Sequence, residues 1–306
     1  MAKHTVKITL ILLAMFFTAQ IIGLYVAHAY TPETLSILNQ SSGNYQNETN
    51  YFLPSALVPP PETTPQTSVT SLLISLVLAV IIMLLLMKFR AETFLRVWFF
   101  VVITLGIAIG INAFILKIDN SIILALAIAF PLAYIKVFKR HLIVHNLTEL
   151  IIYPGLAVIF ILFLSKIWAV VLFLIIISIY DIWAVWHAGF MQKMAKYQIE
   201  KLRLFSGFFV PYISRKEREL MRKAKGKSRK IKAHIAILGG GDVIFPIILA
   251  GVVLRTLGLW QALLISIGAT IALAILFYFS EKGKFYPAMP FITAGCFIGL
   301  GLGYLL

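Results

Sequence analysis

Nine stretches of the sequence are apolar over a length that can cross a lipid bilayer, and few folds are open to such a chain. A helix rises about 1.5 Å per residue, so a hydrocarbon layer of roughly 30 Å needs about 20 apolar residues. With 60% hydrophobic residues, 13% charged residues and a mean hydropathy of +0.94, the chain cannot cover its apolar surface in water. The sequence predicts an all-α membrane protein with nine transmembrane helices, over residues 8–29, 70–87, 97–116, 121–138, 149–165, 167–190, 233–254, 257–280 and 285–306.

The 27 Lys and Arg residues fall mostly on one side of the predicted membrane. When the nine stretches cross alternately, 24 of these residues lie on the side of the N-terminus, and only Lys117, Lys166 and Arg255 lie on the other. Because cytoplasmic loops are enriched in Lys and Arg, the N-terminus and the basic loop 191–232 are predicted inside and the C-terminus outside. The net charge of +15 is therefore a topology signal that also favours anionic lipid, and we expect no nucleic-acid partner.

The segments between the stretches differ in composition, and we interpret the whole chain as a single membrane domain. Residues 1–190 are predicted to hold helices one to six with an external loop over 30–69, which carries six of the twelve prolines and no Lys or Arg. Residues 191–232 form a cytoplasmic loop, in which 202–213 is apolar but too short to span. We expect this short segment to lie in the membrane interface or to dock against the bundle. Residues 233–306 hold helices seven to nine.

Small residues within the apolar stretches predict close packing. Gly106-x-x-x-Gly110 and Gly295-x-x-x-Gly299-x-x-x-Gly303 have the spacing of helix–helix contacts in membranes. The single cysteine, Cys296, also lies in an apolar stretch and is expected to pack in the core. A disulfide framework and a cysteine-based metal cluster are thereby excluded.

Two of the twelve acidic residues lie well inside the apolar stretches, whereas the other ten, Glu149 among them, lie at the ends of stretches or between them. Asp181 lies nine residues before the inner end of the sixth stretch, and Asp242 lies nine residues after the inner start of the seventh. Each is thus predicted about 13 Å deep. An ionised carboxyl in hydrocarbon is costly, so both aspartates are candidates for function.

Two carboxyl groups at one depth on neighbouring helices can share a single proton. Such a pair is suited to peptide hydrolysis, because the ionised carboxyl takes a proton from water while the protonated one donates to the scissile carbonyl. A proton- or cation-coupled transporter or channel would use the same carboxyls, and charge and depth do not separate the two functions. The simplest alternative is that each aspartate only bonds a helix neighbour such as Tyr180 or a backbone group.

Glycines precede Asp242, and prolines open the ninth stretch. Gly239, Gly240 and Gly241 loosen a helix and let another backbone approach closely, which would help an extended peptide to lie beside the carboxyl. The prolines of 287–290 remove two backbone donors, so this segment is not expected to be a regular helix. Irregular backbone at membrane depth is tolerated only beside protein or water, so we expect a cavity near the aspartates.

Three short motifs resemble the signatures of the presenilin and signal peptide peptidase family of intramembrane aspartyl proteases. The family has Y-D, G-x-G-D and P-A-L-P, in that order. The matching residues here are Tyr180-Asp181 with Ala184-Val185, then Gly239-x-Gly241-Asp242, then Pro287-Ala288-Met289-Pro290. The positions of the motifs on the sixth, seventh and ninth stretches also fit the family.

The resemblance implies a presenilin-like bundle in which helices six and seven carry the catalytic Asp181 and Asp242 and helix nine carries the proline motif. It implies an endopeptidase that needs no cofactor or metal and whose partners are transmembrane helices of substrate proteins in the lipid bilayer. The substrate-binding residues that it implies are Tyr180, Gly239, Gly240, Gly241, Pro287, Ala288, Met289 and Pro290.

Two departures from the family pattern bear on cleavage-site preference: Gly240 stands where the family usually has a larger apolar residue, and Met289 replaces Leu. Two alternatives stay open. One is the ion-coupled transporter or channel, and the other is a prepilin-peptidase-like protease, which also uses a G-x-G-D aspartate.

Overall fold

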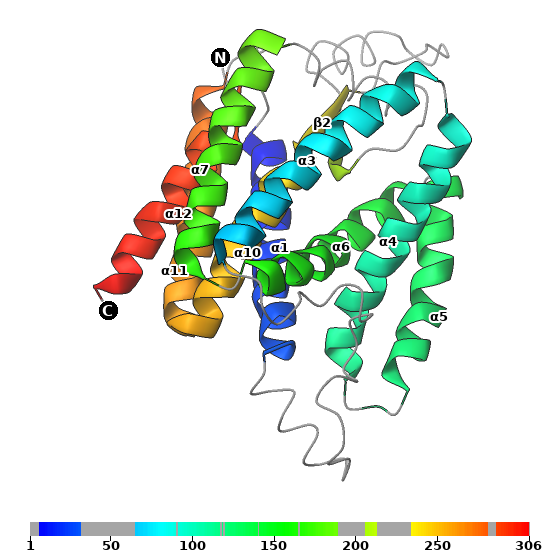
Figure 1. Cartoon of the computed structure of the whole chain (residues 1–306), viewed down its shortest axis with the longest axis horizontal. Helices are drawn as coiled ribbons and strands as arrows, with labels where there is room; N and C mark the ends of the chain where they lie inside the picture. Colours follow the sequence, from blue (N-terminus) through cyan, green and yellow to red (C-terminus); the bar gives the residue numbers. More distant parts are fainter. Residues whose placement is uncertain are drawn as a thin grey trace, which may run out of the picture.

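The computed structural model describes residues 6–31, 65–89, 91–116, 118, 120–139, 141–164, 166–188, 206–212, 234–280 and 286–305. Nine α-helices lie within these residues (Figure 1): α1 Val6–Ala29, α3 Pro65–Lys88, α4 Glu92–Ile115, α5 Ser121–Tyr134, α6 Leu142–Phe163, α7 Ile167–Trp183, α10 Gly240–Thr256, α11 Leu259–Phe279 and α12 Met289–Tyr304. Two π-helical turns, η2 Ile135–Lys139 and η3 Ala184–Ala188, extend α5 and α7. Most of the predicted loops 30–69 and 191–232 lie outside the described residues.

The helices have the lengths and composition of an integral membrane protein. Seven segments in the described part are apolar and long enough to cross a bilayer. The helices α10 and α12 are shorter, with 17 and 16 residues. At about 1.5 Å per residue they span roughly 25 Å, somewhat less than a hydrocarbon layer of about 30 Å. The predicted nine-helix layout is thus present, but two of its members are short.

The predicted all-α fold is present, and a two-stranded antiparallel sheet accompanies its helices. Strand β1 (Gly207–Tyr212) pairs with β2 (His234–Gly239), so that Gly207 lies opposite Gly239 and Tyr212 opposite His234. The predicted seventh stretch 233–254 therefore begins as a strand, and its helix starts only at Gly240. Hydropathy could not separate the two states, because a short apolar run fits a buried strand as well as a helix. The described part of the 202–213 segment, residues 206–212, is the partner strand.

Two other predicted boundaries also change. Helix α6 begins at Leu142, almost two turns before the predicted stretch 149–165, so Glu149 lies within the helix and is buried. Helix α12 begins at Met289, so only part of the 287–290 segment is irregular. Pro290 is accommodated in the first turn, where a helix does not need the backbone N–H that proline lacks.

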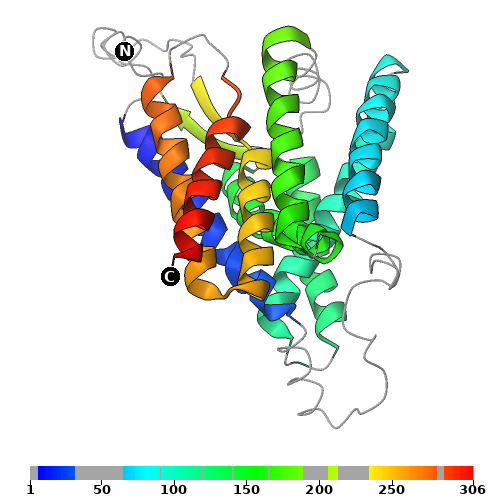
Figure 2. The same cartoon turned by 60° about the vertical axis from the view of Figure 1, so that its left-hand side comes forward.

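The helices form two groups that share α1 and α6. Helices α4 and α5 pack side by side, whereas α7, α10, α11 and α12 lie together on the other side of the molecule (Figure 1). Helix α3 stands at the periphery (Figure 2), and almost none of its side chains are buried. The hairpin lies at the end of the bundle where α1 begins, and α12 runs toward the opposite end (Figure 2).

Glycines allow the closest helix contacts, as the spacing predicted. A Cβ atom on Gly295 would overlap the carbonyl oxygen of Gly268, so α12 and α11 touch backbone to backbone. A Cβ on Gly155 of α6 would likewise overlap the carbonyl oxygen of Gly106 on α4. In lipid, where burial of apolar surface gives helices little reason to associate, such van der Waals packing is a principal source of stability.

Candidate active site

Asp181 lies near the end of α7 and is buried, with 9% of its surface exposed. Three residues later, at Ala184, the helix changes from α to the π geometry of η3, and the N–H of Ala184 bonds to the carbonyl oxygens of both Tyr180 and Asp181. Single π-helical turns often mark functional positions, since they redirect side chains out of the regular α-helical order. The sixth predicted stretch therefore ends as a distorted helix directly after its carboxyl group.

Asp242 is the third residue of α10, whose N-cap, Gly239, has an extended backbone with φ −64° and ψ 143°. Asp242 is partly exposed. A carboxylate in the first turn of a helix faces the unpaired N–H groups and the positive end of the helix dipole, which stabilise negative charge. The strand-to-helix transition at Gly239 thus determines where this carboxyl lies.

The two aspartates lie at matched levels of antiparallel helices. The sequence placed each of them nine residues from the inner end of its stretch, whereas in the structure the matching distances are those to the opposite ends of α7 and α10. Asp181 is fourteen residues from Ile167, where α7 begins, and Asp242 is fourteen residues from Thr256, where α10 ends. Ile167 and Thr256 line the same hollow, so these two ends lie side by side. Fourteen residues of helix correspond to about 21 Å, which leaves the aspartates roughly 9 Å from the near edge of a hydrocarbon layer of about 30 Å. The two carboxyl groups lie within electrostatic range of one another.

The 287–290 segment contacts Asp181 directly. The Met289 N–H donates a hydrogen bond of 3.1 Å to Asp181 Oδ2, and the Ala288 backbone also donates toward this carboxyl. About one turn before Asp181 in α7 and one turn after Met289 in α12, the Ser178 hydroxyl donates to the Thr293 hydroxyl oxygen at 2.8 Å, and both side chains are buried. These contacts join α7 to the start of α12 at the level of the aspartate.

The three glycines before Asp242 have different surroundings. A Cβ on Gly239 would lie 3.3 Å from Asp242 Oδ2, so the absence of a side chain leaves room for the carboxyl. A Cβ on Gly240 would lie 2.7 Å from Tyr153 Cε1 and 2.7 Å from Ser206 Oγ, so this glycine allows α10 to pack against α6. Gly241 is exposed, and a Cβ there would make only ordinary contact with Phe245, at 3.6 Å.

The other predicted positions lie around this centre. Tyr180 is partly buried, and its ring centroid is 6.4 Å from that of the exposed Trp183. Pro287 is buried, whereas Pro290 is partly exposed. The hollow that contains Ile167 and Thr256 is at the far end of these helices, so the cavity expected beside the aspartates stays a prediction.

Sequence reasoning missed a polar cluster on η2 and α6, formed by the buried Lys136, His145 and Glu149 and the partly buried Asn146. Lys136 Nζ lies 2.8 Å from Glu149 Oε1, and the side chains of both are almost fully buried. The polar side chains of His145 and Glu149, one helical turn apart inside an apolar segment, were the available signal. Among the described residues, no three His, Cys, Asp or Glu side chains come together as possible metal ligands.

The arrangement can divide two roles between two carboxyl groups. One carboxyl is held by backbone N–H groups of the 287–290 segment, and the other lies at a helix N-terminus. A pair that holds one proton can accept a proton from water on one side and donate to a carbonyl oxygen on the other.

Comparisons with known proteins identify a family for the chain and match its fold. Residues 55–306 match the family described as signal-peptide peptidase, presenilin aspartyl protease. A solved structure of a presenilin family intramembrane aspartate protease in space group C222 aligns with a TM-score of 0.60 at 18% identity, over 97% of this chain and 98% of that one. A second structure described in the same words, in space group P2, aligns with a TM-score of 0.58 at 18% identity, over 96% of each chain. A search of curated proteins finds no match.

Proposed function

Since the chain belongs to the signal peptide peptidase and presenilin family of aspartyl proteases, we propose that Asp181 and Asp242 are the catalytic pair with which it cleaves peptide bonds inside the membrane. The observation that carries the proposal is the convergence of three distant segments. Asp181 of α7 lies within electrostatic range of Asp242 of α10 and accepts a hydrogen bond from Met289 at the start of α12. These are the three segments in which the family motifs occur.

In the proposed mechanism, the pair holds one proton and a water molecule lies between the two carboxyl groups. The ionised carboxyl removes a proton from the water, which attacks the scissile carbonyl carbon while the protonated carboxyl donates to the carbonyl oxygen. The tetrahedral diol then collapses as the nitrogen of the leaving amine is protonated. No covalent intermediate forms on the enzyme.

The neighbouring residues would bind substrate by their backbone and shape. Gly239 and Gly241 leave space beside Asp242, and Ala288 and Met289 keep Asp181 in place through their N–H groups. A peptide bond within a helix is shielded and already hydrogen-bonded, so a substrate helix has to unwind before it is cut. Tyr180, Gly240, Pro287 and Pro290 complete the proposed substrate-binding set.

We propose that the N-terminus and the basic loop 191–232 are cytoplasmic and that the C-terminus is outside. The Lys and Arg distribution supports this orientation. The position of the hairpin at the end where α1 begins supports only that the loop and the N-terminus share one side. The aspartates would then lie nearer the cytoplasmic face, which is the shorter route for water. Transmembrane helices of single-span proteins with an external N-terminus are the expected substrates.

Purified protein in detergent, incubated with a peptide that corresponds to a transmembrane helix, tests the proposal. We expect cleavage that an aspartyl-protease transition-state analogue blocks, and that Asp181→Asn and Asp242→Asn each abolish, because one carboxyl cannot serve as both acid and base. Both variants should stay folded and membrane-inserted, as judged by size-exclusion elution and thermal unfolding. Substantial cleavage by either variant would refute the pair, and ion flux through vesicles without any cleavage would favour a transporter.

A further inference from the structure

The buried ion pair between Lys136 and Glu149 has no part in the proposed chemistry, so the burial of these two charges needs another explanation. Lys136 belongs to η2 and Glu149 to the middle of α6, and their side-chain exposures are 4% and 1%. Desolvation of two charges offsets much of their attraction, so a buried ion pair by itself is weak support for stability. Such groups can instead fix one particular arrangement of the segments around them.

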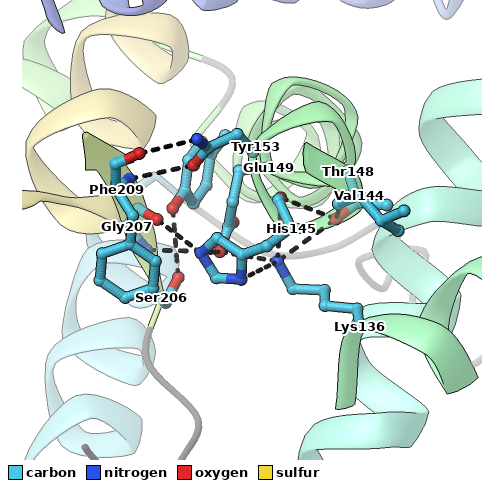
Figure 3. Close-up of polar contacts among 10 residues, drawn as sticks. Lys136, Val144, His145, Thr148, Glu149, Tyr153, Ser206, Gly207 and Phe209 are labelled. Atoms are coloured by element: carbon cyan, nitrogen blue, oxygen red, sulfur yellow. Dashed lines mark hydrogen bonds and ion pairs between the residues drawn. The ribbon is translucent and has the colours of Figure 1, made fainter. Parts of the chain in front are cut away.

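The side chains around this ion pair bind the outer edge of β1, the edge that does not face β2 (Figure 3). His145 Nε2 lies 2.8 Å from the carbonyl oxygen of Gly207, and the N–H of Gly207 donates to Glu149 Oε1 at 3.3 Å. Two residues along the strand, Asn146 donates to the carbonyl oxygen of Phe209 at 2.8 Å and accepts from its N–H at 3.0 Å. Three side chains of α6 thus satisfy four backbone groups that β2 does not reach.

Lys136 orients the two side chains that bind Gly207. Its ammonium group lies 2.8 Å from Glu149 Oε1 and 3.4 Å from His145 Nδ1, and it also donates to Thr148 Oγ1 at 3.3 Å. A histidine protonated on Nε2 satisfies both of its contacts, because Nδ1 accepts from the lysine while Nε2–H donates to the strand. The partners of His145 therefore select one tautomer and one ring orientation.

The hairpin transmits this position to the start of α10. Gly207 lies opposite Gly239 in the sheet, and the N–H of Gly240 donates to the carbonyl oxygen of Ser206 at 3.3 Å. The Ser206 hydroxyl also lies 3.4 Å from that of Tyr153, which fills the space beside Gly240. Asp242 follows Gly240 by two residues.

We infer that Lys136, His145, Asn146 and Glu149 are positioning residues that hold β1, and through β1 and β2 place the carboxyl group of Asp242. Because these side chains occupy the outer edge of β1, the strand can pair only with β2, and only in the register that places Gly207 opposite Gly239. The inference rests on the proposed function, because it assigns these four residues to the placement of a catalytic aspartate. They do not touch the reacting atoms.

Kinetics of the full-length protein in detergent with the same helical peptide test the inference. Asn146→Ala removes both bonds to Phe209 and leaves no buried charge unpaired, and Glu149→Gln removes the acceptor charge. We expect kcat to fall roughly tenfold or more with KM within about twofold, because a displacement of about 1 Å at a catalytic group can cost up to ~10²-fold. The matched control is Asn112→Ala, which removes a buried hydrogen bond of 3.1 Å to Tyr30 on other elements and should lower thermal stability while kcat is unchanged.

A cross-link reports on the strand register without relying on activity. Val210 lies opposite Ala236, so cysteines at these two positions, with Cys296 replaced by Ala, should form a disulfide in the native register. We expect Asn146→Ala to reduce this cross-link and to increase the off-register one between positions 210 and 238, whereas Asn112→Ala should change neither. If the single charge variants do not fold, Lys136→Met with Glu149→Gln removes both charges and should give folded protein of low kcat.

Two results would overturn the inference: unchanged kcat and register in Asn146→Ala and Glu149→Gln, or wild-type kcat in the folded double variant. A wild-type protein that does not cleave the peptide would instead defeat the proposed function. The cross-link would then still decide whether the four residues hold the strand.

Discussion

Gly240 gives the sharpest prediction about how the carboxyl of Asp242 is placed. It stands where related proteases usually carry a larger side chain, and here the ring of Tyr153 and the hydroxyl of Ser206 occupy that space. In Gly240→Ala, the new Cβ would lie 2.7 Å from Tyr153 Cε1 and 2.8 Å from its hydroxyl oxygen. This is about 0.8 Å short of an ordinary contact near 3.5 Å, so either α10 or the tyrosine has to shift.

The expected change in the free energy of unfolding follows from two opposing effects. Overpacking of a buried site costs about 1–3 kcal/mol, and alanine gains up to ~1 kcal/mol over glycine in a helix. At the first turn of α10 the gain is smaller, so we expect Gly240→Ala to destabilise the protein by about 1–2 kcal/mol. A shift of the first turn by a sizeable fraction of 1 Å should lower kcat by roughly 10- to 100-fold, because Asp242 lies in that turn.

Thermal unfolding in detergent and initial rates of peptide cleavage measure the two effects. Tyr153→Leu makes room for the new methyl group, so a double-mutant cycle should show that the two substitutions together cost less than the sum of their separate costs. Gly301→Ala is the matched control, because a Cβ there meets no atom within 4 Å and should leave turnover unchanged. Wild-type stability and turnover in Gly240→Ala, or strictly additive effects with Tyr153→Leu, would refute the steric reasoning.

Three further predictions concern the contacts of α12. Ser178→Ala removes the donor to Thr293, so it should cost about 1 kcal/mol of stability and lower turnover, whereas the double variant with Thr293→Val should recover part of the stability because no polar group stays unpaired. Gly295→Val should lower the thermal unfolding temperature by separating α12 from Gly268 of α11, at a cost of about 1–3 kcal/mol. Cys296 is buried with 1% exposure, so a membrane-permeant thiol reagent should label it in the folded protein far more slowly than after unfolding.

Each of these predictions has a clear contrary result. Equal stability of the single and double Ser178 and Thr293 variants would show that the bond is not made. An unaltered unfolding temperature in Gly295→Val would mean that the α11–α12 contact is looser than described, and rapid labelling of Cys296 in the native state would place it outside the core.

The membrane character and the family of this protein could be predicted from sequence because both depend on local information. An apolar run of about 20 residues has few options in water, whatever surrounds it. The residues of the three motifs are contiguous, so the chemistry could be read before the helices were arranged. The glycine contacts on α4 and α12 were likewise predictable, because helical spacing alone puts such glycines on one face.

The placement of the candidate site depends on contacts between segments far apart in the chain. Whether 234–239 is a strand or the start of a helix was decided by its pairing with 207–212, and no local pattern encodes that partner. Glu149 was predicted at a helix end and lies buried, because Lys136 and the backbone N–H of Gly207 in β1 compensate its charge. Hydropathy adds the contributions of neighbours in sequence, whereas burial of a charge is decided by neighbours in space, and only the folded chain brings those together.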